Sequence, residues 1–339
     1  NNKLIAFEER HLSGMIFFQT QRGCPLSCSY CTNHIIKGLY KNKSPILRSH
    51  SVDYSIEELS RLKDRFHSIQ VFDIRDETFL VRPLSWIKDF SEKYKEKISI
   101  RFKCLAEPAS MSIDEISEEK IKLLVDAGLT DIIIGIQSGS DNINFNIYKR
   151  YITAAQVLKC AQVVNKFKYK LTVMYDIMAC NPYEEKEDVL ASINLIRKLP
   201  KPFYLSVNNL IFFEGTPLYE KAIKDNIIKN GRDSASGLNY WDRLNHIKLK
   251  KKNTYLNLIL NLMRGKATEQ KYGLIPAKLL DKLVSEKTVN FNYNHSLFTS
   301  IAGSFVQLLD YFRESIAKPI YRSMPVSFKL WYDKVRYKA

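Results

Sequence analysis

The sequence predicts an α/β fold in which parallel strands alternate with helices, followed by a mainly helical extension. Apolar runs of strand length alternate with stretches of helical spacing over the first 220 or so residues. Residues 131–136 are apolar almost throughout, which is typical of a parallel strand buried on both faces. Gly128 stands where the helix before that strand should end. Together these patterns favour repeated strand–helix units.

The first unit opens with an expected strand at residues 14–20, which leads directly into a cysteine-rich loop. Ser55 and Glu58 have the spacing of a capping box, so we expect the first helix to begin there. Apolar residues then recur at helical spacing at Leu59, Leu62 and Phe66.

The later units follow the same order. We expect strands at residues 69–74, 98–105, 131–136, 171–178 and 203–213, and helices at 83–94, 121–127, 153–167 and 189–196. Six such units predict a barrel or partial barrel of parallel strands, and an open doubly wound sheet fits the same pattern. The absence of a glycine-rich phosphate loop weighs against a nucleotide-binding sheet.

The pattern changes after residue 225, and the polar stretch 229–239 marks a boundary. We therefore expect a core domain at residues 1–225 and a basic, mainly helical extension at 226–339. Helical spacing recurs at residues 255–263, 276–283, 297–312 and 325–335.

The net charge of +16 is unevenly spread over the 339 residues. Residues 1–200 carry +4 and residues 201–339 carry +12. A basic extension suits RNA, a membrane surface or an acidic protein, and it also suits a merely solvated face. No run reaches the 18 or so apolar residues of a membrane span. Three of the six cysteines share one loop, which favours a metal site in a reducing cytoplasm over a disulfide framework.

The cysteine loop carries the strongest chemical signal. Cys24, Cys28 and Cys31 have the spacing C-x3-C-x2-C, and no fourth cysteine follows in the run. Three thiolates can hold three irons of a 4Fe-4S cluster and leave the fourth iron open, whereas an electron-carrying cluster normally takes four thiolates. The alternative is a structural zinc site made of these cysteines and His34.

The run Arg-Gly-Cys-Pro-Leu-Ser-Cys-Ser-Tyr-Cys resembles the cluster loop of the radical S-adenosylmethionine (radical SAM) superfamily. The resemblance covers residues 12 to about 220 and implies a (β/α)6 partial TIM barrel. It also implies S-adenosylmethionine bound to the open iron, with Tyr30 packed near it. In such barrels the site gathers at the carboxyl ends of the strands.

By the same resemblance, other strand ends supply contacts to S-adenosylmethionine. Asp76 and Glu77, in Asp-Glu-Thr-Phe, are similar to the family element that binds its amino group. Gln137 and Ser138 correspond to side chains that hold the ribose hydroxyls and the methionine part. Arg150 corresponds to a residue that pairs with the carboxylate in bidentate fashion.

The end of the fifth strand, residues 176–184, resembles the family's Ile-x-Gly-x-Pro-Gly-Glu element but lacks its glycines. Cys180 lies at this rim and is the one catalytic side chain that we single out, facing substrate. Residues 215–219, Gly-Thr-Pro-Leu-Tyr, match the family's closing turn.

These features point to the branch of the family that often carries a cobalamin-binding domain before the barrel. If the protein has such a domain, we expect it upstream of Asn1. The implied enzyme takes one electron from a small donor such as flavodoxin or ferredoxin and cleaves S-adenosylmethionine to a 5′-deoxyadenosyl radical. That radical removes hydrogen from an unidentified substrate, and cobalamin would direct the outcome to methyl transfer.

Three alternatives stay open. A tRNA-modifying enzyme would grip RNA through the basic extension and its aromatic residues Tyr240, Trp241 and Tyr255. A non-enzymatic interaction protein would use zinc or a cluster for stability alone. An apolar, amphipathic stretch at 297–312 would place a cytoplasmic enzyme at a membrane surface.

Overall fold

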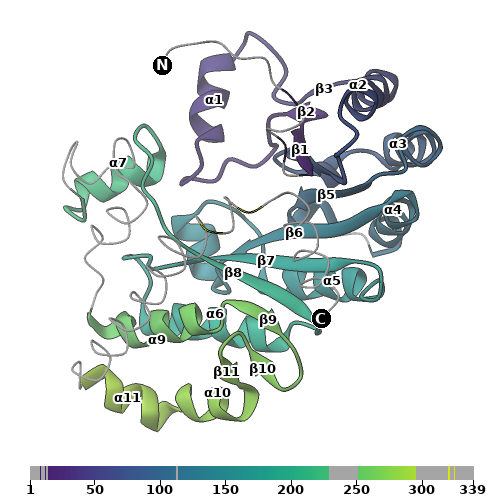
Figure 1. Cartoon of the computed structure of the whole chain (residues 1–339). Helices are drawn as coiled ribbons and strands as arrows, with labels where there is room; N and C mark the ends of the chain where they lie inside the picture. The colour runs from purple at the N-terminus through teal and green to yellow at the C-terminus, as the bar shows by residue number, and fades with distance from the viewer. Residues whose placement is uncertain are drawn as a thin grey trace.

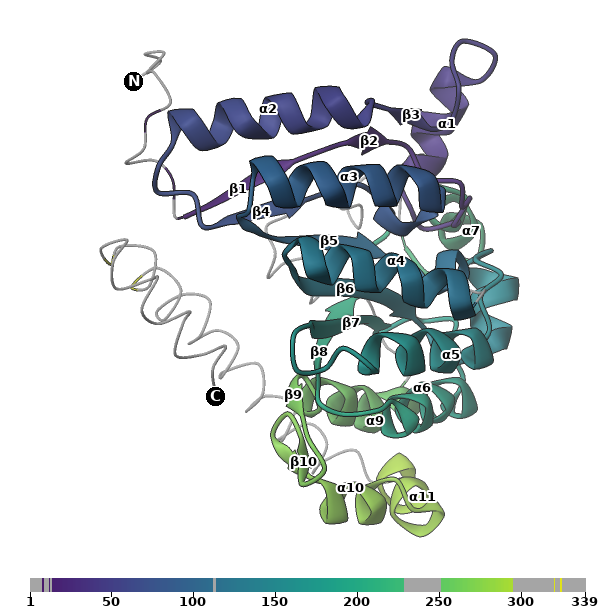
Figure 2. The same ribbon diagram turned by 90° about the vertical axis from the view of Figure 1, so that its right-hand side faces the viewer.

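The computed structural model describes residues 8, 12, 14–111, 114–228, 251–294, 320 and 324. Its centre is a nine-stranded sheet with the order β1-β4-β5-β6-β7-β8-β9-β10-β11 (Figure 1). The first six strands in this order pair in parallel and the last three are antiparallel. The crossover helices stack along the outer face of the parallel strands (Figure 2). This topology confirms the predicted partial barrel.

The strand–helix units occur in the predicted order. The parallel strands are β1 (Met15–Phe18), β4 (Val71–Ile74), β5 (Arg101–Ala106), β6 (Leu129–Gln137), β7 (Thr172–Ala179) and β8 (Phe203–Asn209). The crossover helices are α2 (Val52–Arg65), α3 (Leu84–Lys97), α4 (Asp114–Ala127), α5 (Ala154–Asn165) and α6 (Lys186–Lys198).

Smaller elements surround the cysteine loop. The strands β2 (Gln21–Arg22) and β3 (Arg48–Ser49) form a separate antiparallel pair on either side of α1 (Asn33–Tyr40). A π-helix, η4 (Ile143–Ile147), follows β6, and α7 (Pro217–Lys224) follows β8. The sequence patterns did not predict α1, η4 or α7 as elements, since all three are short.

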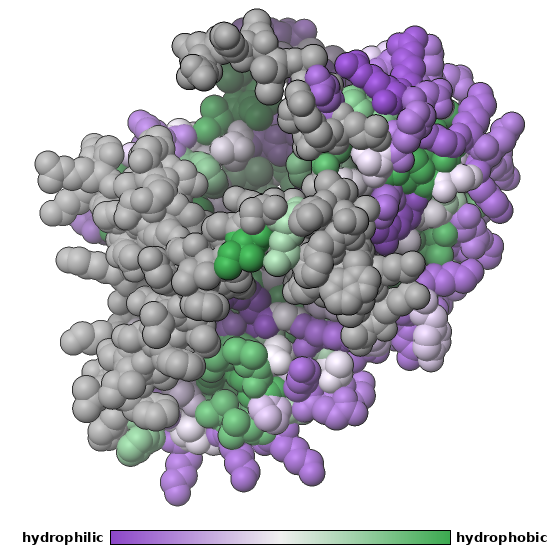
Figure 3. All heavy atoms as spheres, in the orientation of Figure 1, coloured by the Kyte–Doolittle hydropathy of each residue, from purple (hydrophilic) through white to green (hydrophobic). Residues whose placement is uncertain are grey.

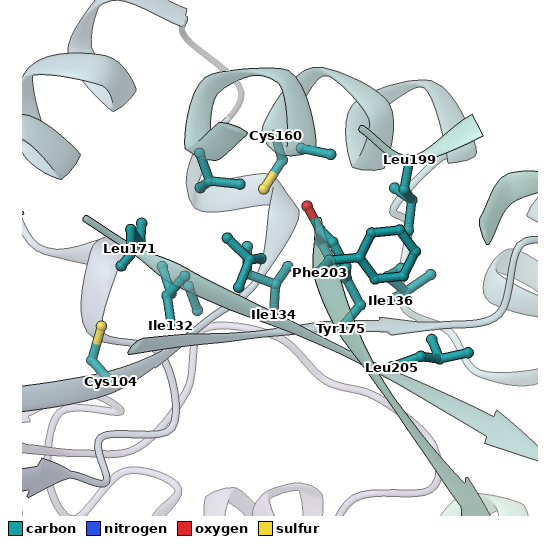
Figure 4. Packing of buried hydrophobic residues seen from close by; sticks show 14 of the residues in the cluster. Cys104, Ile132, Ile134, Ile136, Cys160, Leu171, Tyr175, Leu199, Phe203 and Leu205 are labelled. Atoms are coloured by element: carbon teal, nitrogen blue, oxygen red, sulfur yellow. The ribbon is translucent and has the colours of Figure 1, made fainter. Parts of the chain in front are cut away.

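The strands β5, β6, β7 and β8 largely alternate between buried and more exposed residues, whereas three successive residues of β4 are all buried. In β6, Ile132, Ile134 and Ile136 are fully buried, whereas Ile133 and Gly135 are partly exposed. The expectation that this strand is buried on both faces was wrong, because only the face toward the helices is fully packed. Figure 4 shows that outer layer, with Ile132, Ile134 and Cys160 in one cluster. The outer surface of the helices is largely hydrophilic (Figure 3).

The start of α2 also differs from the prediction. The helix begins at Val52, and the Ser51 side chain accepts a hydrogen bond from the Tyr54 N–H at 3.2 Å. Ser55 lies inside the first turn and donates to the Ser51 carbonyl at 2.9 Å, so the predicted Ser55–Glu58 capping box does not form. Ser51 is an equally good N-cap one turn earlier, and it determines where the helix begins.

The described part of the extension continues the barrel. The helix α9 (Lys251–Leu262) packs against α6 and β7, and Leu256 and Leu260 join the main hydrophobic core. Four further elements follow β9 (Gly265–Ala267), which pairs with β8: β10 (Lys271–Tyr272), β11 (Ile275–Pro276), α10 (Ala277–Leu283) and α11 (Glu286–Asn294).

Two of the helices expected in the extension are confirmed, as α9 and α10. The other two, at residues 297–312 and 325–335, lie outside the described residues, and the domain boundary after residue 225 stays a prediction. Within the described ranges, no helix is long and apolar enough to span a bilayer.

Candidate cofactor site

The cysteine loop is tied to two other parts of the rim through one serine. The Ser29 N–H donates to the Tyr148 carbonyl at 2.8 Å, and its hydroxyl donates to the Ile147 carbonyl at 2.6 Å. The Ser29 carbonyl accepts from the Leu218 N–H, at the start of α7, at 2.9 Å. The loop is therefore held between the end of η4 and the start of α7.

The three cysteine thiols influence one another. Burial raises the pKa of Cys24 to about 11, and the neighbouring Cys28 and Cys31 thiolates add to that rise. Burial also raises the pKa of Cys28. Cysteine binds a metal as the thiolate and releases its proton on binding, so a bound cation would hold these side chains in that form.

The grouping of these thiols bears on the zinc alternative. A zinc ion draws its ligands to within about 2.3 Å of one point. Among the described residues, no three His, Cys, Asp or Glu side chains are grouped to hold a single ion, and His34 is exposed at the start of α1. In a 4Fe-4S cluster each thiolate takes a different iron, so that donor set need not converge on one point. Three cysteine thiolates are a donor set that either a cluster or a zinc ion accepts, so metal content decides between the two.

Arg150 and Tyr30 meet beside the cysteine loop. The Arg150 Nη1 donates to the Tyr30 hydroxyl at 2.9 Å, and Nη2 donates to the Gly135 carbonyl at 2.7 Å. Burial works to lower the pKa of Arg150, but Tyr30 and Cys28 outweigh it and raise that pKa. Arg150 therefore stays charged, and its buried Nε has no hydrogen-bond partner among the described residues.

Asp76 uses its carboxylate to support the rim. It is fully buried and accepts from the Thr20 N–H (2.7 Å), the Thr20 hydroxyl (2.5 Å), the Gln21 N–H (2.9 Å) and Arg82 (3.0 Å). Burial raises the pKa of Asp76 in spite of these contacts, which each lower it. The residue joins the end of β4 to the chain entering the cysteine loop.

Glu77, the next residue, is placed differently. Its side chain is partly exposed, and its buried Oε2 has no hydrogen-bond partner in the part of the chain that the structure describes. A buried acceptor without a partner costs about 1–3 kcal/mol unless a ligand satisfies it. We predicted that Asp76 and Glu77 bind an amino group. The Asp76 carboxylate already accepts hydrogen bonds from the protein, so Glu77 is the one with a carboxylate oxygen left for a ligand.

The side chains of Gln137 and Ser138 also lie in different surroundings. Gln137 ends β6 in a left-handed conformation (φ 68°), and its amide nitrogen would lie 2.6 Å from a Cβ added to Gly135. Ser138 is fully buried, with its hydroxyl 3.4 Å from the Ser192 hydroxyl on α6 and 3.5 Å from Glu184. The structure thus gathers Gln137 with Arg150 around Gly135 and turns Ser138 toward α6.

Cys180 lies after β7 in a left-handed conformation (φ 60°), which glycine adopts most readily. Its N–H donates to the Asn257 Oδ1 at 2.8 Å, so α9 of the extension holds this turn. Burial raises the pKa of Cys180 to about 12. Because the thiolate is the reactive form, Cys180 is a poor nucleophile at neutral pH.

Sequence reasoning missed Glu184 and Asn257. Glu184 is almost fully buried, and burial, then the charge of Asp188, raise its pKa to about 8. Asn253 donates to the Glu184 carbonyl at 2.5 Å. One sequence signal was available, since Asn253, Asn257 and Asn261 recur every four residues in a helix interior, where asparagine is disfavoured.

The residues on the rim fit the cofactors expected from the resemblance. An acceptor without a partner at Glu77 and a donor without a partner at Arg150 suit the ammonium and carboxylate of an amino acid group. Three thiols on one firmly held loop suit the cluster.

Comparison with known proteins gives concordant results. Residues 18–196, more than half of the chain, match the Radical SAM superfamily. An uncharacterised methyltransferase of Pyrococcus horikoshii, PH0819, is 28% identical over 231 residues, which are 66% of this chain and 46% of that protein. The chain therefore spans about half the length of this curated relative.

A solved structure, that of OxsB, shows the same fold. OxsB, a cobalamin-dependent S-adenosylmethionine radical enzyme with aqua-cobalamin and S-adenosylmethionine bound, matches with a TM-score of 0.55 and 16% identity. The match covers 96% of this chain and 50% of OxsB. The methyltransferase TsrM of Kitasatospora setae matches with a TM-score of 0.49 and 18% identity, over 63% of this chain and 39% of TsrM. From the family match, we conclude that this chain is an enzyme of the radical SAM superfamily.

Proposed function

We propose that Cys24, Cys28 and Cys31 hold a 4Fe-4S cluster and that the rim around them binds S-adenosylmethionine for reductive cleavage. When bound, the cluster supplies one electron that splits S-adenosylmethionine and yields the 5′-deoxyadenosyl radical that attacks substrate. The observation that carries this proposal is that Glu77 Oε2 and Arg150 Nε, on the rim that holds the cysteine loop, are among the buried polar atoms without a hydrogen-bond partner in the described part of the chain.

Each rim residue has a distinct part in the proposal. Glu77 accepts hydrogen bonds from the ammonium group, and Arg150 offers Nε to the carboxylate while holding Tyr30 beside Cys28. Gln137, which can donate and accept, serves the ribose hydroxyls. Asp76 and Ser138 act behind the rim by fixing the elements that carry these groups.

The outcome of the reaction is proposed to be methyl transfer with cobalamin. Support comes from the Pyrococcus horikoshii relative, which bears the name methyltransferase, at 28% identity. The fold shared with OxsB, a cobalamin-dependent enzyme, is in line with this. Cobalamin would be bound by a further part of the protein, and the electron would come from a flavodoxin- or ferredoxin-type donor.

The test is 5′-deoxyadenosine formation by the protein purified without oxygen and reconstituted with iron and sulfide. S-adenosylmethionine and dithionite are added, and the product is quantified by mass spectrometry. We expect product from the wild type and none from Cys28→Ala. Cys160→Ala removes a core thiol away from the loop and serves as the matched control. Bound zinc in place of iron, or equal product from Cys28→Ala, would contradict the proposal.

The tRNA alternative receives no support from the described residues. Tyr255, one of the three aromatics expected to stack on bases, is buried, and its hydroxyl donates to the Leu283 carbonyl at 3.0 Å. A buried ring offers no face to a base, so this part of the expectation was wrong. Tyr240 and Trp241 lie outside the described residues.

A further inference from the structure

We propose that the outer side of the cysteine loop is the docking surface for an acidic one-electron donor protein. We call this surface the donor face and define it as α1 with residues 41–48. The inference rests on the proposed function, because it concerns how an electron reaches the cluster. It adds a location and a partner chemistry to that function.

The donor face lies directly against a cluster ligand. A cavity of about 620 Å³ lies between α1 and residues 41–48, and Cys24 and Ser27 form part of its wall. In Figure 2, α1 and the loop after it project beyond the ends of the stacked helices. A protein seated here would therefore contact the chain next to Cys24 without entering the barrel.

The donor face is unusually apolar for a surface. The helix α1 has no buried residue, although half of it is apolar. Leu39 is 64% exposed and Ile46 is 54% exposed, and Ile36 and Tyr40 are exposed beside them. Apolar side chains gathered in this way mark sites of protein association more often than isolated ones do.

The donor face is also positively charged. No Asp or Glu occurs between Glu9 and Asp53 in the chain. Lys41 and Lys43 are exposed, and the Arg48 guanidinium lies 4.3 Å from the centre of the Tyr40 ring. Lys37 donates to the Pro25 carbonyl at 3.1 Å, which places a further positive charge on the cysteine loop itself.

The apolar residues and the positive charge of the donor face indicate what kind of protein would bind there. Apolar anchors ringed by cations fit a protein with an acidic rim, and opposite charge speeds the encounter. Electron-transfer complexes are small and transient, so one short helix and its neighbouring loop give enough contact. The inner rim is assigned to S-adenosylmethionine through Glu77 and Arg150, which leaves the outer side for the donor. The donor loses one electron and the cluster gains it, with no transfer of atoms.

Binding is tested first, with oxidised flavodoxin as the probe and the full chain at low ionic strength. We expect Lys41→Glu/Lys43→Glu to bind flavodoxin about 10-fold more weakly than the wild type. The control Lys88→Glu/Lys95→Glu makes the same charge change on the exposed face of α3 and should bind as the wild type does. Leu39→Ser tests the apolar part and should also weaken binding. Equal weakening by the control, or no weakening by either donor-face variant, would overturn the inference.

Turnover assays with two electron donors distinguish a defect in docking from a defect in the reaction itself. With reduced flavodoxin, the Lys41→Glu/Lys43→Glu protein should form 5′-deoxyadenosine about 10-fold more slowly at limiting donor. With dithionite it should match the wild type. A wild type inactive with dithionite would contradict the proposed function and not the docking surface. Displacement of flavodoxin by an RNA oligonucleotide but not by a second acidic protein would instead assign the face to nucleic acid and overturn the inference.

Discussion

The two halves of the barrel rim differ in what supports their polar groups. Around β4 and β6, Glu77 Oε2 and Arg150 Nε are buried without hydrogen-bond partners among the described residues. After β7, Asn257 of the extension accepts from the Cys180 N–H, and Asn253 donates to the Glu184 carbonyl. This second half also keeps buried atoms without such partners, Glu184 Oε2 and Asn253 Oδ1. The difference between the halves therefore lies in the contact with the extension, which only the second half makes through these residues.

The largest expected effect is a loss of stability on substitution of Asp76, which lies behind the first half of the rim. Asp76→Asn removes the charge that pairs with buried Arg82 at 3.0 Å. Breaking one member of a buried ion pair costs about 3–5 kcal/mol. The free energy of unfolding, measured in urea, should fall by that amount. A loss of S-adenosylmethionine affinity at unchanged stability would assign Asp76 to the cofactor instead.

Glu77→Gln should affect ligand binding more than stability. It replaces the carboxylate that we assign to the ammonium group, and hydrogen bonds to charged groups contribute about 1.5–3 kcal/mol. The dissociation constant for S-adenosylmethionine, measured by equilibrium dialysis on the reconstituted protein, should rise about 10- to 100-fold. An unchanged constant would remove Glu77 from the site.

Asn257→Ala probes the second half. The change leaves the Cys180 N–H without its acceptor, at a cost of about 1–3 kcal/mol for a buried donor. Asn261→Ala, one turn along the same helix, is the matched control, since among the described residues the Asn261 side chain donates only to the Asn257 carbonyl. Urea unfolding should show the larger loss for Asn257→Ala. Equal losses would mean that the contact to Cys180 carries no special weight.

Cys180→Gly should have the smallest effect. Glycine adopts the left-handed conformation of residue 180 without strain, but it makes the unfolded chain more flexible and therefore raises the entropy cost of folding. The two effects oppose each other, so the free energy of unfolding should change by no more than about 1 kcal/mol. We expect 5′-deoxyadenosine formation and substrate turnover to be retained. Loss of turnover with an intact cluster would support the prediction that Cys180 is a catalytic residue.

Local spacing predicted the strand–helix units and the cysteine loop, whereas the choice of a barrel over an open sheet came from the family resemblance. The sequence could not tell which of two adjacent residues at a strand end faces the site. Asp76 and Glu77, and likewise Gln137 and Ser138, were proposed together, and the structure turns one member of each pair away. The contact between Asn257 and Cys180 joins residues 77 positions apart, and no local pattern encodes such a pairing.

The central claim is that three cysteines hold a cluster whose open iron binds S-adenosylmethionine. The most direct measurement is electron paramagnetic resonance of the reduced, reconstituted protein with and without S-adenosylmethionine, alongside iron and sulfide analysis. The account predicts a full 4Fe-4S load and a spectrum that changes when S-adenosylmethionine is added. A protein that binds zinc, or a cluster whose spectrum is unchanged by S-adenosylmethionine, would contradict it.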